Sequence, residues 1–227
     1  MANNWKIRKD LSIDVCGHTL FRIECTQDFK EIKAGSLGGF IEKEENLDDD
    51  AQVCGDAWVY GNARVYGDAL VYGNARVCGD ALVYGNALVY GNALVCGDAQ
   101  VYGNALVCGD AQVYGNARVC GDAWVYGNAQ VYGDARVYGD AQVCGDKITN
   151  KDDICYISNR YYNITITPLH IKIGCQYHAQ EAWWNFTDEQ IEKMDGESAL
   201  NFWKIWKEPL KQICDAMKKE KGEKDVK

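Results

Sequence analysis

The sequence is poor in histidine and lacks the features that mark export or membrane insertion. It contains three histidines, and none of them lies between residues 19 and 169. No apolar run is long enough to span a bilayer, and the first ten residues, MANNWKIRKD, lack the apolar core of a signal peptide. We therefore expect a soluble, cytoplasmic protein that has no membrane partner.

Basic residues are also scarce in the centre of the chain. The net charge is −9, and no lysine occurs between Lys43 and Lys147. An acidic surface of this kind repels phosphate backbones, so we expect no direct binding of nucleic acid by this part of the chain.

The cysteines do not form a recognisable disulfide or metal pattern. Their number, eleven, is odd, and the central repeats contain no CxxC pair and no histidine. Six of them alternate with tyrosine at one position of a repeat: Cys54, Cys78, Cys96, Cys108, Cys120 and Cys144. We expect these thiols to be reduced and to pack as small hydrophobic groups, and we expect neither a metal nor another cofactor.

Sixteen consecutive copies of one hexapeptide, A-x-V-[YC]-G-[DN], run from Ala51 to Asp146. Ala and Val stand two positions apart, so they point to one side of a strand while the variable residue and the Tyr or Cys point to the other. Gly followed by Asp or Asn favours a tight corner. A short strand and a corner, repeated without a gap, predict a coil with Ala and Val in its lumen.

This hexapeptide resembles the repeat of left-handed parallel β-helices, in which three hexads make one coil. Ile41 and Leu47 occupy the Val position of the two hexads that precede Val53, so two degenerate hexads begin the coil. The sequence therefore predicts a mainly β protein with a left-handed parallel β-helix, a hexapeptide-repeat prism of six coils, over residues 39–146.

A β cap is expected over residues 1–38. Leu11, Ile13 and Val15 alternate, Gly17 marks a turn, and a second strand follows to Cys25, which predicts a β-hairpin. Solenoids need such caps because their end strands are otherwise unpaired. The run GHTLFRIECTQDFKEIKAGSLGGFIEKEENL resembles the N-terminal segment of YdcK-like hexapeptide-repeat proteins of bacteria and prophages.

Residues 147–227 are expected to form a C-terminal α+β module. Alternation predicts strands over residues 154–157, 162–167 and 169–175, with a helical pattern after Cys175. Thr187 and Gln190 form a capping box at the start of a short helix, and a longer helix is expected over 197–221, kinked at Pro209. The predicted apolar face of the longer helix comprises Leu200, Phe202, Trp203, Ile205, Trp206, Leu210 and Ile213.

Two interpretations stand for the aromatic residues of this module. In the first, four tryptophans form the core of a small domain or its docking surface: Trp183, Trp184, Trp203 and Trp206. In the second, the same tryptophans and His178 line a surface that binds a ring-bearing ligand or a partner. His178 and Cys175 resemble a nucleophile–base pair in spacing, but we expect a structural role for both.

Many left-handed β-helix proteins are acyltransferases that carry a catalytic histidine on a coil, and others are carbonic anhydrases that bind zinc through three histidines. The repeats have no histidine and no insertion that would shape a substrate site. They also lack the threonine ladders of antifreeze β-helices. Asn replaces Asp at many of the corners, which lowers the negative charge that a calcium site would need. We therefore expect no catalytic residues.

The outward variable positions separate into three faces when every eighteenth residue is taken. One face reads Gln52, Leu70, Leu88, Leu106, Trp124, Gln142, an apolar stripe with Gln at each end. A contiguous exposed apolar stripe marks an interface, so either self-association as a dimer or trimer or coverage by the C-terminal module is expected.

The function expected from these features is that of a non-catalytic binding or scaffold protein. The resemblance implies a phage or prophage origin. From the rigid acidic rod and the lack of catalytic residues we expect a host protein as the partner, and because regularly spaced Asp can imitate phosphate charge, a host defence protein is one partner that the rod would inhibit. The alternatives are a sponge for small molecules or nucleotides, and a hexapeptide-repeat acyltransferase suggested by the fold alone.

Overall fold

The structure, a computed structural model, describes residues 4–48 and 50–224. The chain divides into two compact units, residues 1–150 and residues 151–227. None of the described helices is both long enough and apolar enough to cross a membrane.

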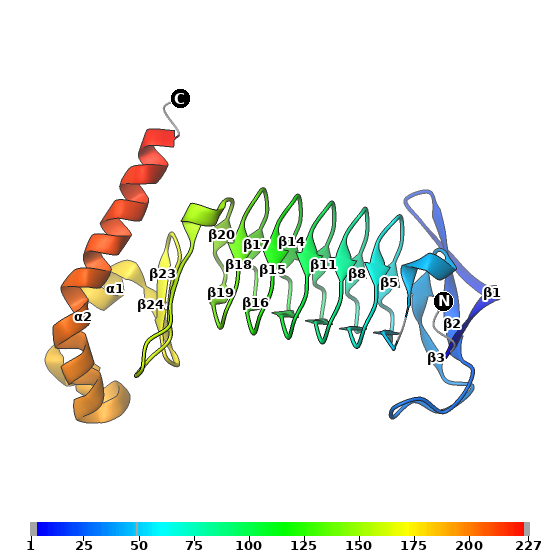
Figure 1. The fold of residues 1–227 in the computed structure, drawn as a ribbon, viewed down its shortest axis with the longest axis horizontal. Helices are drawn as coiled ribbons and strands as arrows, with labels where there is room; N and C mark the ends of the chain where they lie inside the picture. The colour runs from blue at the N-terminus through cyan, green and yellow to red at the C-terminus, as the bar shows by residue number, and fades with distance from the viewer. Residues whose placement is uncertain (1–3, 49, 225–227) are drawn as a thin grey trace. The chain divides into compact units, whose positions relative to one another are not determined.

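The first unit is a parallel β-solenoid, whose stacked coils are visible in Figure 1. Each hexad contributes one short strand, formed by its variable residue and its Val: β4 (Gln52–Val53), β5 (Trp58–Val59), β6 (Arg64–Val65), β7 (Leu70–Val71), β8 (Arg76–Val77), β9 (Leu82–Val83), β10 (Leu88–Val89), β11 (Leu94–Val95), β12 (Gln100–Val101), β13 (Leu106–Val107), β14 (Gln112–Val113), β15 (Arg118–Val119), β16 (Trp124–Tyr126), β17 (Gln130–Val131), β18 (Arg136–Val137) and β19 (Gln142–Cys144). β20 (Lys147–Ile148) follows them. Strands three hexads apart pair in parallel and in register, as in Leu88 with Leu106, so the predicted coil of three hexads is confirmed.

Three sheets form the sides of the solenoid. Two of them have the strand orders β4-β7-β10-β13-β16-β19 and β6-β9-β12-β15-β18. The third is a nine-stranded sheet that begins with β1 (Trp5–Val15), β2 (His18–Cys25) and β3 (Leu37–Ile41) and continues β5-β8-β11-β14-β17-β20. Every Ala and Val of the repeats is fully buried, which confirms the predicted lumen.

The N-terminal hairpin continues the nine-stranded sheet. β1 (Trp5–Val15) and β2 (His18–Cys25) are antiparallel, β2 pairs with β3 (Leu37–Ile41), and β3 pairs in parallel with β5. The predicted hairpin is confirmed, and this end of the sheet is closed by antiparallel strands.

The degenerate hexads join the coil as predicted. Ile41 lies opposite Val59, Leu47 lies opposite Val65, and both side chains are fully buried. Between them a 3-10 helix (Glu44–Asn46) ends at Asn46, whose buried amide donates to the carbonyls of Gly61 and Ala63.

The last coil is one residue shorter than the repeat. Ile148 pairs with Val131, and the carbonyl of Asp146 accepts from the backbone N–H of Gln130, as Ala carbonyls do in the other coils. Asp146 therefore takes the Ala position rather than a corner, and the solenoid includes Ile148.

The second unit is an antiparallel sheet with two helices. Its strands are β21 (Cys155–Ile157), β22 (Ile164–Ile166), β23 (His170–Ile173) and β24 (Gln176–Ala179), and its helices are α1 (Gln180–Asn185) and α2 (Asp188–Lys224). Three strands were predicted correctly. The prediction of helix directly after Cys175 was wrong, because Gly174, at φ 56°, turns the chain into a fourth strand that pairs with β23.

Within α2 the break lies at Asp195 and Gly196, whose dihedral angles are not helical, and the helix continues through Pro209. The capping box is confirmed, because the Thr187 N–H donates to Gln190 Oε1 at 2.9 Å and the Gln190 N–H donates to Thr187 Oγ1 at 3.3 Å. The prediction that Ile205 belongs to the apolar face was wrong, because its side chain is 70% exposed.

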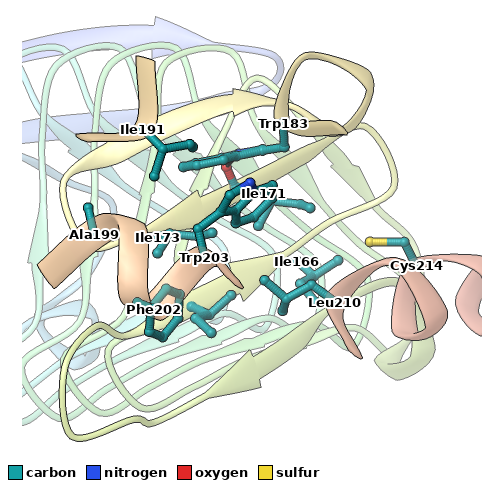
Figure 2. Close-up of a cluster of buried hydrophobic side chains, with 11 residues drawn as sticks. Ile166, Ile171, Ile173, Trp183, Ile191, Ala199, Phe202, Trp203, Leu210 and Cys214 are labelled. Carbon is teal, nitrogen blue, oxygen red and sulfur yellow. Dashed lines mark hydrogen bonds between the residues drawn. The ribbon is translucent and has the colours of Figure 1, made fainter. Parts of the chain in front are cut away.

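Figure 2 shows the core of the second unit, where strands and helix α2 contribute buried side chains. Trp183 and Trp203 are both in this core, 2% and 3% exposed, and Trp184 and Trp206 pack at its edge. The interpretation of these tryptophans as the core of a small domain is therefore supported.

Candidate functional site

Two surfaces combine residue types that suit binding, and the first is on the solenoid. The ridge, defined as Leu70, Leu88, Leu106 and Trp124, lies on four adjacent strands of the six-stranded sheet. The four residues are in register, with Leu88 36% exposed and Trp124 46% exposed. Gln52 and Gln142 stand at the two ends of the same sheet.

A column of tyrosine and cysteine side chains runs beside the ridge, because each ridge residue is followed two positions later by Tyr or Cys. Tyr72 and Tyr90 stack with ring centroids 4.8 Å apart. A hydrogen bond with Cys108 and burial raise the pKa of Tyr90 to about 12, so the phenol stays neutral at physiological pH. The ridge therefore has an uncharged flank on this side.

The other two sheets carry charge at the equivalent positions. On the nine-stranded sheet the Arg76 guanidinium lies 5.2 Å from the centroid of the Trp58 ring. On the five-stranded sheet Arg118 and Arg136 are in-register neighbours. Only the six-stranded sheet presents an apolar residue on four successive coils among the described residues.

The second surface is in the C-terminal unit, around the buried tryptophans. His178 packs edge-on against Trp183 and Phe186, with ring centroids 5.2 and 5.0 Å apart. Burial lowers the pKa of His178, which favours the neutral imidazole. The Nε2 atom of His178 lies 3.3 Å from Gln176 Oε1, and Gln176 Nε2 lies 3.8 Å from Cys175 Sγ, so Gln176 stands between the imidazole and the thiol. This arrangement suits a structural role for His178.

A cavity of about 190 Å³ opens beside this core. We call it the aromatic cavity, and it is lined by Tyr162, Ile173, Cys175, Gln176, Trp183, Ile191, Met194, Asp195, Ala199, Phe202 and Trp203. It includes two of the predicted residues, Trp183 and Trp203, whereas His178, Trp184 and Trp206 are not among its lining residues.

Sequence reasoning did not find Tyr162 and Asp195, whose side chains meet at the aromatic cavity although they are 33 residues apart. The Asp195–Gly196 dipeptide is a turn signal inside a helical pattern, and it marks the helix break that places Asp195 there. Tyr162 carries no comparable signal in the sequence.

No metal centre is built into the parts of the chain that the structure describes. Within residues 4–48 and 50–224, no three His, Cys, Asp or Glu side chains gather in a way that would hold an ion.

The repeats match a family model. Nine matches to the YdcK beta solenoid repeat run from residue 51 to residue 145, and they coincide with the parallel coils of the structure. The protein is a YdcK-like β-solenoid repeat protein. No curated protein matches the chain. The ridge lies entirely within the YdcK repeats, and the aromatic cavity lies outside them.

Proposed function

We propose that this YdcK-like protein is a non-catalytic binding protein, in which the solenoid is a rigid scaffold and the ridge is the surface through which copies of the chain associate. The observation that carries the proposal is the register of Leu70, Leu88, Leu106 and Trp124 on adjacent strands. At ~4.8 Å between coils these four side chains form a ridge roughly 15 Å long. Fully burying an exposed Leu side chain stabilises by about 1.5–3 kcal/mol, and Leu88, which is 36% exposed, retains roughly a third of this gain for an interface.

The histidines support a role without catalysis. The solenoid coils between residues 51 and 146 contain none. His18, on the N-terminal hairpin, pairs through Nδ1 with Glu42 at 2.8 Å and packs against Tyr60. An acyltransferase of this fold would need a histidine on a coil as general base.

The partner we propose, beyond a second copy, is a host protein that meets the acidic surface of the solenoid in the cytoplasm. Its support is the charge, nine Asp against four Arg in the sixteen hexads, together with the resemblance of the N-terminal segment to prophage proteins. Such a surface attracts basic partners and repels nucleic acid.

The test is the mass of the full-length protein in solution, measured by multi-angle light scattering at micromolar concentration. The wild type is expected to be a dimer or trimer. Leu88→Glu together with Leu106→Glu is expected to give a monomer with an unchanged circular dichroism spectrum, because like charges meet at the contact.

The matched control adds the same two charges elsewhere. Gln100 and Gln112 occupy the equivalent outward positions of β12 and β14, on the other two sheets. Gln100→Glu with Gln112→Glu is expected to keep the oligomer. A monomeric wild type, or equal dissociation of both double variants, would refute the proposed role of the ridge.

Catalysis is tested separately with acetyl-CoA and a panel of amine and sugar acceptors. We expect no turnover above background. Turnover that His178→Ala abolishes would show that the protein is an enzyme with its site in the C-terminal unit.

A further inference from the structure

The aromatic cavity is large enough for one ring. Its volume of about 190 Å³ is of the order of the ~150 Å³ apolar cavity that binds benzene in an engineered protein core. Its wall is made by the core of the C-terminal unit, in which Trp183, Ile191 and Trp203 are each at most 3% exposed. Figure 2 shows Trp183, Ile191, Ala199, Phe202 and Trp203 in this region.

The indole N–H of Trp183, in the wall of the aromatic cavity, already has a hydrogen-bond partner. Trp183 Nε1–H donates to the carbonyl of Ile171 at 2.8 Å, which leaves the indole ring as an apolar surface. Trp183 and Trp203 lie with their ring centroids 5.3 Å apart and tilted by 38°. A ligand in contact with this wall is therefore held by apolar and aromatic contact.

The opening of the aromatic cavity has a different character. The Tyr162 hydroxyl donates to Asp195 Oδ2 at 2.7 Å, and Asp195 is exposed. Burial and this hydrogen bond raise the pKa of Tyr162 to about 12, so the phenol remains a donor that orients the carboxylate. The helix break at Asp195 and Gly196 holds this carboxylate beside the opening.

The charge of the lining is of one sign. Asp195 is the one acidic residue among the described residues that line the cavity, and no Lys, Arg or His lines it. A phosphate or carboxylate ligand would find no cation, whereas an ammonium would find a carboxylate and several aromatic faces.

We infer that the aromatic cavity binds a small organic cation, an ammonium group joined to a single aromatic ring, with the ring against Trp183 and Trp203 and the ammonium beside Asp195 and Tyr162. This site is independent of the ridge and of the self-association proposed above.

The probes are three ligands that share a phenethyl group and differ in the charge of its substituent: phenethylamine, 2-phenylethanol and 3-phenylpropanoate. Binding to the full-length protein is followed by NMR through the indole N–H signals. Phenethylamine is expected to bind about tenfold more tightly than the alcohol, and the alcohol more tightly than the carboxylate. Absence of binding by the amine, or equal binding of all three, would overturn the inference.

Asp195→Asn removes the charge and keeps an acceptor for the Tyr162 hydroxyl. It is expected to reduce the preference for amine over alcohol from about tenfold to about one, while binding of the alcohol is unchanged. The control is Asp188→Asn, an exposed position of α2 outside the aromatic cavity, which should leave the preference intact. A preference that survives Asp195→Asn would contradict the role of this carboxylate.

A second pair of variants tests the place of the ring. Ala199→Phe is expected to fill the aromatic cavity and abolish binding of both amine and alcohol, whereas Ala216→Phe, at an exposed position of the same helix, should not. If Ala199→Phe unfolds the C-terminal unit, the comparison of Asp195→Asn with the wild type still tests whether the aromatic cavity binds the amine. Unchanged binding by a folded Ala199→Phe variant would place the ligand elsewhere and overturn the inference.

Discussion

At the scale of single residues, the outward positions of the repeat form columns that interact from coil to coil. Asn amides at the corners donate to the side-chain oxygen at the same corner of the next coil, as in Asn74 to Asn92 at 3.2 Å and Asn92 to Asp110 at 2.9 Å. An Asp can accept in such a column but cannot donate.

The first prediction concerns one hydrogen bond of this column, from Asn92 to Asp110. Asn92→Asp removes the donor to Asp110 and puts two carboxylates on neighbouring coils, so it should lower the urea midpoint of unfolding. The decrease should be smaller at high salt, because salt screens the repulsion between the carboxylates. Asp110→Asn retains an acceptor for Asn92 and should leave the midpoint nearly unchanged. Urea titrations followed by circular dichroism at two salt concentrations make the comparison, and equal midpoints for both variants would contradict the column argument.

The tyrosine and cysteine column of the nine-stranded sheet places two thiols on adjacent coils. Cys78 and Cys96 directly follow Val77 and Val95, which are paired in register on neighbouring strands. A hydrogen bond from Cys96, another from the Tyr60 hydroxyl and the charge of Arg76 lower the pKa of the Cys78 thiol to about 6, although burial opposes this. By contrast, burial raises the pKa of Cys54.

The second prediction follows from the direction of these shifts. A lowered pKa populates the thiolate at lower pH, so Cys78 should be alkylated by iodoacetamide faster than Cys54 at pH 7 and should lose this reactivity below about pH 6. Cys96→Ala should move the midpoint for Cys78 upward. Peptide mass spectrometry after timed labelling measures both, and labelling of Cys78 no faster than Cys54 would show that the thiolate is not stabilised.

At the scale of the element, the hexad depends on a Gly corner for two separate reasons. Each repeat Gly has a positive φ, and most lie against the Gly of the next coil. A Cβ on Gly79 would stand 2.9 Å from the backbone N of Gly97, whereas a Cβ on Gly145 would meet nothing within 4 Å. Both glycines have a φ of 71°.

The third prediction uses Gly79 and Gly145 to separate the cost of a positive φ from the cost of a steric clash between neighbouring coils. Gly145→Ala should cost about 1–2 kcal/mol, the usual penalty of an L residue in the left-handed region. Gly79→Ala should cost clearly more, because the coils must also move apart. Chemical denaturation of both variants gives the difference, and equal stability would mean that the close approach of neighbouring coils is unimportant.

At the scale of the whole molecule, the two units bury separate cores. The solenoid core is a lumen of Ala and Val, and the second core contains Ile166, Trp183, Trp203 and Leu210. Because each unit has its own set of buried side chains, a lesion in one core is expected to leave the other folded.

The fourth prediction tests this independence. Leu210 is fully buried, so Leu210→Ala should destabilise the C-terminal unit by about 2–5 kcal/mol. Hydrogen exchange should accelerate in residues 151–224 and stay unchanged in the solenoid. Ile205→Ala, at an exposed position of the same helix, should affect neither unit. Faster exchange throughout the chain in Leu210→Ala would instead indicate one cooperative unit.

The solenoid could be predicted from the amino-acid sequence alone. Because every hexad repeats the same alternation, counting three hexads forward from a residue identifies its neighbour, and this arithmetic predicted the ridge from Leu70 to Trp124 and the burial of Ile41 and Leu47. Periodicity turns a long-range contact into a local rule, which fails only at the last coil, where the repeat is one residue short and Val131 pairs with Ile148.

The features that depend on unrepeated contacts could be seen only in the three-dimensional structure. Strand β24 has no strong β-forming pattern and exists through its pairing with β23. Ile205 belongs to an apolar sequence, but its side chain is 70% exposed. Tyr162 meets Asp195 from 33 residues away. The aromatic cavity arises from such contacts. Their geometry is set by packing between distant, dissimilar segments, which no local period encodes.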